Sequence, residues 1–229
     1  MNHISKIVKS TALLGALAFV SAVSSQAGTL TLWDSWGGGN GLGGGEYTIT
    51  GDAYIATLAS SYSASTRVGA GFESFCLEEN VGIYSGTPYN YSISSKAQTQ
   101  NDALSLGTAY LYSQFANGVL AGYNYTNLTQ RALDADDLQI AIWWLENEGS
   151  WVYNASNKFE LAVFTKFGSV VGARADNNGL YGAAVLNITD SNGADKQDQL
   201  VRVPDGGLTV ALFGFAVLGL ALIRRKIAA

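Results

Sequence analysis

Residues 133–149 read "LDADDLQIAIWWLENEG", and this stretch predicts a helix that packs against the core of an α+β domain. Asp134 is a suitable N-cap, and the carboxylates of Asp136 and Asp137 would complement the helix dipole in the first turn. Gly149 is a suitable end of the helix. Apolar side chains recur at helical spacing and are expected to face the core: Leu138, Ala141, Ile142 and Leu145.

Strand-like and helical segments lie on either side of this helix. A helix is expected before it, from about residue 101 to 116, and a third after it, ending near residue 167, with a strand at 159–163 as the alternative. Short runs bounded by turn residues predict strands at 29–33, 46–50, several places within 52–91, 179–188 and 198–203. The expected fold is α+β, with a mostly antiparallel β scaffold (a barrel or a sandwich) and a helical insertion of roughly two to three helices.

The N-terminus has the three parts of a secretory signal peptide. Lys6 and Lys9 precede an apolar run at residues 11–23, and the small residues Ser25 and Ala27 follow it at the positions that a signal peptidase requires. The run is shorter than the roughly 20 residues of a membrane-spanning helix. Residues 1–27 are therefore expected to be removed on export.

The C-terminus also has three parts. A short motif is followed by an apolar stretch at 208–223 and by the basic residues 224–226, which place the end of the chain on the cytoplasmic side. The motif consists of Val203, Pro204, Asp205, Gly206 and Gly207.

This tail resembles the exosortase sorting signals of bacterial surface proteins. These are the PEP-CTERM type, and in particular its VPDSG-CTERM variant, with Gly206 in place of the serine. The resemblance implies an envelope or cell-surface protein of a bacterium, with exosortase as a partner and residues 203–229 as a temporary membrane anchor. A permanent single-pass anchor is the alternative. A single mature domain is expected at residues 28–202.

Composition excludes several classes of function. The chain is acidic, with a formal net charge of −5, and an acidic surface repels phosphate backbones, so nucleic acid is not an expected partner. The only histidine, His3, lies in the signal peptide, so the mature domain has no histidine for a catalytic triad or a metal site. The glycine-rich run at 37–45 lacks a phosphate-binding motif and predicts a flexible loop. We expect no cofactor and no metal.

The only cysteine is Cys76, so the domain has no disulfide and no thiolate zinc site. It follows Phe75 in "ESFCLEEN", residues 73–80, and Gln139 lies 63 residues further on in "LQIAIW". Bacterial thioester domains of surface adhesins carry a cysteine directly after an aromatic residue on a strand, and a glutamine in a "TQxAIW" helix start. The chain resembles this family over residues 73–148 and more loosely elsewhere. Leu138 stands where the family has threonine.

The resemblance implies a thioester between Cys76 and Gln139. The Cys76 thiolate would attack the Gln139 carboxamide and expel ammonia, which leaves an electrophilic acyl group that an amine or a hydroxyl of a partner can attack. Water must be kept away from such a bond, and the candidate shielding residues are Phe75, Trp143 and Trp144. Glu78, Glu79 or a tyrosine is a candidate for a general base.

Other readings remain open. A lone cysteine is often a small buried hydrophobe, residues 138–146 also suit an ordinary core helix, and a related domain can keep the scaffold without the bond. In function, we expect covalent adhesion or matrix cross-linking to an extracellular protein or polysaccharide, which is a single event and not enzyme turnover. The alternative is a non-covalent structural or exopolysaccharide-associated matrix protein, whose tyrosines and tryptophans stack on sugar rings. A hydrolase using Glu146 and Glu148 is less favoured, because these side chains point in different directions on a helix.

Overall fold

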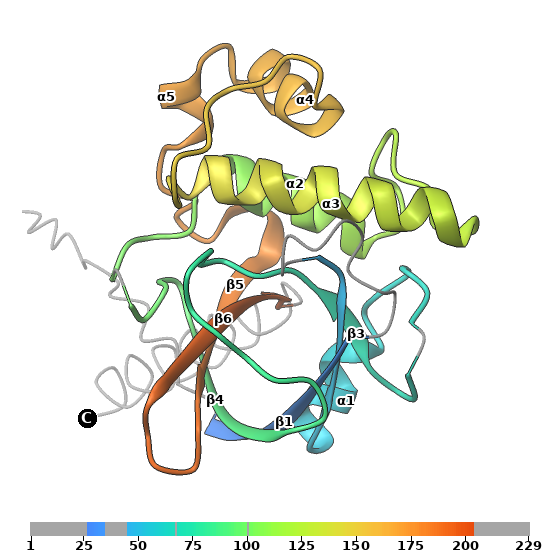
Figure 1. Cartoon of the computed structure of the whole chain (residues 1–229), viewed down its shortest axis with the longest axis vertical. Coiled ribbons are helices and arrows are strands. Elements are labelled where there is room, and N and C mark those ends of the chain that lie inside the picture. The colour runs from blue at the N-terminus through green and yellow to red at the C-terminus, as the bar shows by residue number, and fades with distance from the viewer. Residues whose placement is uncertain (1–26, 35–44, 67, 100, 204–229) are drawn as a thin grey trace, which may run out of the picture.

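The computed structural model describes residues 27–34, 45–66, 68–99 and 101–203. Six antiparallel strands form one curled sheet in the order β3-β2-β1-β4-β5-β6 (Figure 1). The strands are β1 (Ala27–Asp34), β2 (Tyr47–Gly51), β3 (Phe72–Ser74), β4 (Pro88–Ser94), β5 (Ala183–Thr189) and β6 (Asp195–Arg202). The α+β class and the antiparallel scaffold are confirmed. The strands of the described residues form one curled sheet and not the two packed sheets of a sandwich.

Four helices lie between β4 and β5 in the sequence: α2 (Leu106–Ala116), α3 (Leu128–Leu145), α4 (Lys158–Phe167) and α5 (Val170–Ala173). They form a layer above the sheet, with α2 and α3 closest to it (Figure 1). A further helix, α1 (Ala53–Ala59), follows β2, and a short 3-10 helix, η2 (Leu180–Gly182), precedes β5. The helical insertion is therefore confirmed, although it holds one short helix more than the sequence predicts.

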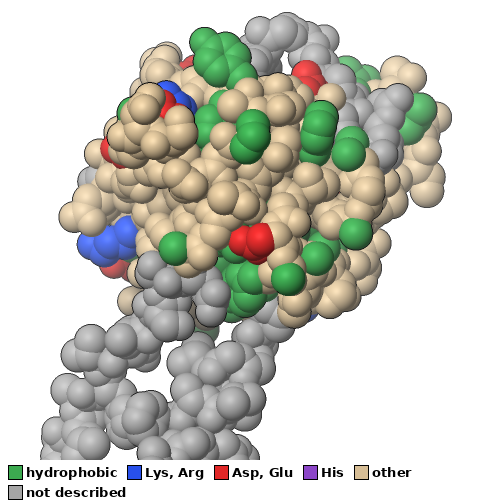
Figure 2. All heavy atoms as spheres, turned by 90° about the horizontal axis from the view of Figure 1, so that it is seen from below, with side chains coloured by type: hydrophobic (Ala, Val, Ile, Leu, Met, Phe, Trp, Pro, Cys, Tyr) green, Lys and Arg blue, Asp and Glu red, His purple; other side chains and the backbone are tan. Residues whose placement is uncertain are grey.

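The fold has two hydrophobic clusters. They are separate because successive side chains of a strand point to opposite faces of the sheet. Val185 of β5 and Leu200 of β6 pack with α2, α3 and α4, in a cluster that we call the helical core. Their neighbours Leu186 and Val201 belong to a second cluster, the sheet core, with apolar side chains of β1, β2, β4 and α1. On the end of the molecule in Figure 2, hydrophobic side chains are scattered among polar ones.

The boundaries of α3 differ from the prediction. The helix begins at Leu128, because the Asn127 side chain accepts a hydrogen bond from the Gln130 amide and so acts as the N-cap. Asp134 is therefore not the cap, and Asp134, Asp136 and Asp137 lie in the middle of the helix and not in its first turn. The helix ends at Leu145, before the predicted Gly149.

Two other helices also depart from expectation. The helix predicted from residue 101 begins at Leu106, because the Ser105 hydroxyl accepts a hydrogen bond from the Thr108 amide. Helix α1 lies where short strands were predicted, and the Asp52 carboxylate caps it. The third predicted helix is confirmed as α4, and the two predicted closing strands are confirmed as β5 and β6.

The two edges of the sheet meet directly after β3. The Leu77 amide donates to the Asp198 carbonyl at 3.0 Å, and the Leu200 amide donates to the Phe75 carbonyl at 3.1 Å. Between these bonds Cys76 forms an isolated antiparallel bridge with Gln199. We call this contact of residues 75–77 with β6 the seam. It places the single cysteine at the point where the curled sheet closes on itself.

Candidate functional site

Cys76 and Gln139 lie against each other in the protein interior. The Cys76 amide donates to Gln139 Oε1 at 2.9 Å, and Gln139 Nε2 donates back to the Cys76 carbonyl at 2.8 Å. Cys76 is 0% exposed and Gln139 is 1% exposed. The seam supplies the cysteine and the middle of α3 supplies the glutamine. The fold therefore brings together the two residues that the sequence singles out, in a buried site.

The carbonyl oxygen of the Gln139 side chain has a second backbone donor. The Gly45 amide, at the end of the glycine-rich run, donates to Gln139 Oε1 at 3.2 Å. Two backbone N–H groups thus converge on one oxygen. This is the arrangement that stabilises the negative charge on the oxygen of a tetrahedral acyl-transfer intermediate.

An ion pair between Glu46 and Arg131 attaches the end of the glycine-rich run to α3. Arg131, two turns before Gln139, donates to both oxygens of the Glu46 carboxylate, and both side chains are fully buried. The Tyr123 hydroxyl also donates to Glu46, at 2.7 Å. Because Gly45 directly precedes Glu46, this ion pair fixes the position of the Gly45 amide relative to Gln139.

The sulfur of Cys76 also has a hydrogen-bond donor. Gln199 Nε2 lies 3.2 Å from Sγ, across the seam. Burial raises the pKa of the Cys76 thiol to about 12, and the nearby Glu78 raises the pKa further. Gln199 and, to a smaller extent, Gln197 act in the opposite direction. The thiol is therefore protonated at neutral pH, and it becomes a nucleophile only as its proton leaves.

Two carboxylates lie beside the seam. Glu78 Oε2 accepts a hydrogen bond from the Asp198 amide at 2.8 Å, and burial together with the Asp198 charge raises the pKa of Glu78. Burial also raises the pKa of Asp198. Glu79, the other candidate base, is only partly buried, and its amide donates to Glu148. Among the carboxylates considered from sequence, Glu78 is the one that acts on the thiol electrostatically.

The aromatic residues predicted to shield the bond occupy different surroundings. Phe75 packs edge-on against Phe115 in the helical core, with ring centroids 5.0 Å apart. Trp144 also belongs to the helical core. Trp143 is 1% exposed, stacks on Trp151 at 6.1 Å, and lies one helical turn after Gln139 on the same side of α3. Shielding stays a prediction for all three, and Trp143 is the best placed.

Other polar residues noted in the sequence serve local structure. Glu146 accepts a hydrogen bond from the Ser105 amide at the end of α3, and Glu148 accepts one from Glu79. These separate partners do not combine the two carboxylates into one hydrolytic site. Leu138 is fully buried in the helical core, so the position before Gln139 supplies packing and no hydroxyl.

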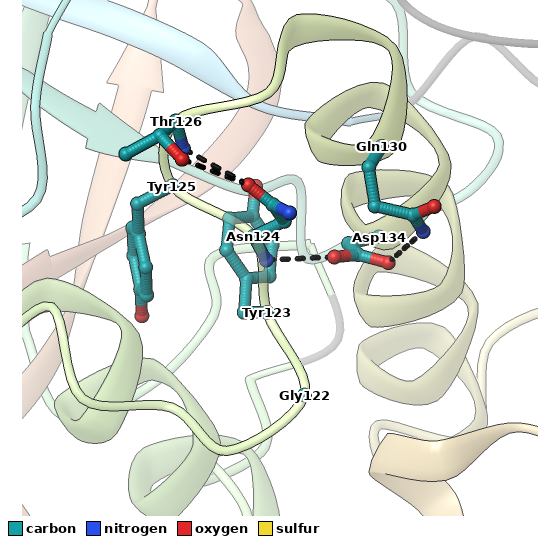
Figure 3. Close-up of a pocket in the computed structure, with 7 residues that line it drawn as sticks. All are labelled: Gly122, Tyr123, Asn124, Tyr125, Thr126, Gln130 and Asp134. Atoms are coloured by element: carbon teal, nitrogen blue, oxygen red, sulfur yellow. Dashed lines mark hydrogen bonds between the residues drawn. The ribbon is translucent and has the colours of Figure 1, made fainter.

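A surface pocket of about 510 Å³ lies beside the first half of α3 (Figure 3). Its lining comes from the loop before α3 and from the helix: Gly122, Tyr123, Asn124, Tyr125, Thr126, Gln130 and Asp134. The Asp134 carboxylate accepts hydrogen bonds from the Asn124 amide at 2.7 Å and from Gln130 at 2.8 Å, and it pairs with Lys158. These bonds anchor the loop to the helix, so we assign the pocket no chemistry.

Sequence reasoning missed Gly45 and Gln199. Gly45 was read only as the end of a flexible loop, and Gln199 only as part of a closing strand. The sequence does hold a signal for Gln199, because glutamines recur with a period of two at positions 197 and 199. In the structure both lie buried in β6, at positions where apolar side chains are usual.

Two further features concern the described residues only. None of their acidic and cysteine side chains form a group of three or more able to hold a metal ion. Within the same residues, every helix is too short or too polar to cross a membrane. The predicted signal peptide, apart from Ala27, and the predicted anchor at 208–223 lie outside the described residues.

The end of the chain matches a known sorting motif. Residues 202–227 match a family model described as the VPDSG-CTERM motif. The tail is a sorting signal. It supports export to the envelope or surface of a bacterium, and it is compatible with processing by exosortase and with membrane anchoring. Val203 ends the described part, with its amide bonded to the Gly182 carbonyl, and Pro204, Asp205, Gly206 and Gly207 lie beyond it.

No curated protein and no solved structure matches the chain. Known proteins therefore give no support to the resemblance to thioester domains, and the thioester depends on the geometry of Cys76 and Gln139.

Proposed function

We propose that this exported domain forms an internal thioester between Cys76 and Gln139 and uses it to attach covalently to an amine or hydroxyl of an extracellular protein or polysaccharide. The observation that carries the proposal is the pair of reciprocal hydrogen bonds between the Gln139 carboxamide and the Cys76 backbone, at 2.9 and 2.8 Å. They hold the reacting amide beside the only cysteine of the chain, in a site closed to water.

Formation of the bond is an acyl transfer within the chain. Sγ of Cys76 attacks Cδ of Gln139, and the carbonyl oxygen takes the negative charge while it accepts from the amides of Cys76 and Gly45. The C–N bond then breaks. The nitrogen leaves as ammonia, with the thiol proton as its third hydrogen. Glu78, whose charge acts on the thiol and whose carboxylate is held by the Asp198 amide, is the candidate to assist this proton movement.

In capture of a partner, the Cys76 sulfur is the leaving group and an atom of the partner is the nucleophile. The nitrogen or oxygen of a partner attacks Cδ of Gln139, a new amide or ester bond forms, and the C–S bond breaks. The proton lost by the partner is taken up by Cys76, which returns to the thiol. Each molecule acts once, since Gln139 stays attached to the partner.

Intact-mass measurement of the exported protein, produced from the full chain, tests this function. The mature protein should weigh about 17 Da less than its sequence, which is the mass of the expelled ammonia. Methylamine should then add about 31 Da and leave a free thiol. Gln139→Glu, which has no ammonia to lose, is the matched control. A wild-type mass equal to that of the sequence, with Cys76 open to alkylation after unfolding, would disprove the proposal.

A second candidate is non-covalent association with exopolysaccharide. It is favoured by exposed aromatic side chains at one end of the sheet, where Trp33 is 36% exposed and Tyr84 is 76% exposed. The Asp34 amide bonds to Ser85, which keeps the two aromatic positions near each other. This candidate predicts that Trp33→Ala weakens retention on the matrix while Cys76→Ala does not. The covalent proposal predicts loss of all boiling-resistant adducts in Cys76→Ala.

A further inference from the structure

Gln199 is a buried amide that is only partly hydrogen-bonded among the described residues. It is 0% exposed, its Nε2 lies 3.2 Å from Cys76 Sγ, and its Oε1 has no partner among the residues that the structure describes. The residues that follow it in β6, Leu200 and Val201, are apolar and pack into the two cores. A glutamine buried in this way lowers stability relative to an apolar residue. Its contact with the sulfur therefore calls for a functional explanation.

The strength of the hydrogen bond from Gln199 depends on the charge of the Cys76 sulfur. A neutral thiol and a thioester sulfur are both weak acceptors, whereas a thiolate is a charged acceptor and forms a stronger bond. The Gln199 N–H group therefore stabilises the sulfur most when negative charge develops on it. Interactions that strengthen on the way to the transition state are the ones that accelerate a reaction.

We propose that Gln199 is a catalytic residue of the Cys76–Gln139 site, a role that rests on the proposed function. It donates to Sγ as the thiol proton leaves and the sulfur attacks Cδ of Gln139. In capture it donates again to the departing thiolate, as the C–S bond breaks and before the sulfur takes up the proton of the incoming amine. The two charged atoms of the reaction then have separate donors. Gly45 and Cys76 amides hold the oxygen, and Gln199 holds the sulfur.

The test is the rate at which trifluoroethylamine, a weakly basic amine, consumes the thioester, followed by intact mass, in the exported protein and in Gln199→Met. Methionine keeps the length of the side chain without the donor. We expect the rate to fall by roughly tenfold to a hundredfold, less than for loss of a donor to an oxyanion because sulfur is a weaker acceptor. Asn177→Leu is the matched control, since Asn177 is also a buried amide with an unpartnered oxygen in the described structure, but it donates to the Ala183 carbonyl.

A second readout separates catalysis from packing. With weakly basic amines, departure of the thiolate limits the rate, because such amines leave the tetrahedral intermediate easily. Gln199→Met should therefore slow trifluoroethylamine more than methylamine, whereas a general disturbance of the site would slow both equally. Gln199→Glu keeps the size and polarity of the side chain but places a carboxylate beside the sulfur, and it should slow both the formation and the aminolysis of the thioester. It also serves if the methionine variant does not fold.

The outcomes distinguish this inference from the proposed function. If the wild-type protein shows no loss of ammonia, the proposed function itself fails. If the wild-type protein forms the thioester and the Gln199 variants react as fast as Asn177→Leu, Gln199 has no catalytic role and the proposed function stands. An equal slowing of both amines in Gln199→Met likewise overturns the inference.

Discussion

Replacement of Arg131 by methionine tests how the fold supports the site. Arg131 donates hydrogen bonds to both Glu46 oxygens, to the Ser65 hydroxyl and carbonyl, and to the Tyr125 carbonyl. The ion pair with Glu46 is completely buried. Removing one partner of a buried pair leaves a charge without compensation and typically costs about 3–5 kcal/mol of the free energy of unfolding. At about 2–4 °C per kcal/mol for a domain of this size, the melting temperature should fall by about 6–20 °C.

The effect should also depend on pH. Burial raises the pKa of Glu46 against the opposing influence of Arg131, so loss of the arginine raises this pKa further. Above that pKa the variant has to bury an ionised carboxylate, whereas below it the carboxyl is neutral and the loss is smaller. The deficit in stability should therefore grow as the pH rises. Chemical denaturation of Arg131→Met and of wild type at about pH 5 and at about pH 8 measures this deficit.

Two variants serve as controls for this experiment. Lys196→Met breaks the ion pair with Asp190, in which the two side chains are 26% and 27% exposed, and should lower the free energy of unfolding far less than Arg131→Met. The double variant Glu46→Gln/Arg131→Met should lose less stability than the sum of the two single variants, because no charge is left buried. A loss in Arg131→Met no larger than that in Lys196→Met, or strictly additive effects in the double variant, would refute the reasoning.

Three further predictions concern single side chains. Trp143→Leu should speed hydrolysis of the thioester, measured by the return of an uncapped thiol with time, whereas Trp144→Leu, in the helical core, should mainly lower the melting temperature. Burial raises the pKa of Glu146 to about 7 from 4.5, so its stabilising effect is complete below pH 4.5 and is lost as the pH rises through 7. Denaturation curves should show wild-type stability falling by up to about 1.4 kcal/mol per pH unit in this window, and Glu146→Gln should flatten the curve. Leu138→Thr, which introduces the threonine that thioester domains carry before their glutamine, should cost about 1–3 kcal/mol by burying a hydroxyl in the core, and an increase in thermal stability would contradict this.

The sequence predicted the elements whose signals are local. Strands β5 and β6 have apolar runs bounded by turn residues, and α4 has a helical period and the αL glycine Gly168 at its end. The start of α3 was misplaced because Asp134 has the composition of a cap. In the structure it accepts bonds from the preceding loop instead, and Asn127 caps the helix one to two turns earlier. Local propensity does not distinguish these two roles for an aspartate.

The candidate site was predictable only in part. Cys76 and Gln139 were found because the motif around each residue is short and continuous. Gln199 is 123 residues from Cys76 and meets it only because the two edges of the sheet come together at the seam. Gly45 contributes a backbone amide, and the identity of a residue says nothing about where its amide points. Contacts of this kind depend on closure of the whole sheet and not on any one segment.

The position of Gln139 in the middle of α3 has a mechanical consequence. A captured partner would pull at residue 139, and the sorting signal would hold the chain beyond β6. Tension between two surfaces would then run through residues 139–203, since capture cuts the covalent link to Cys76. The covalent path would leave out the first four strands, although β4 is hydrogen-bonded to β5. Resistance to stretching would come from the second half of α3, from α4 and α5, and from the hydrogen-bonded pair of β5 and β6.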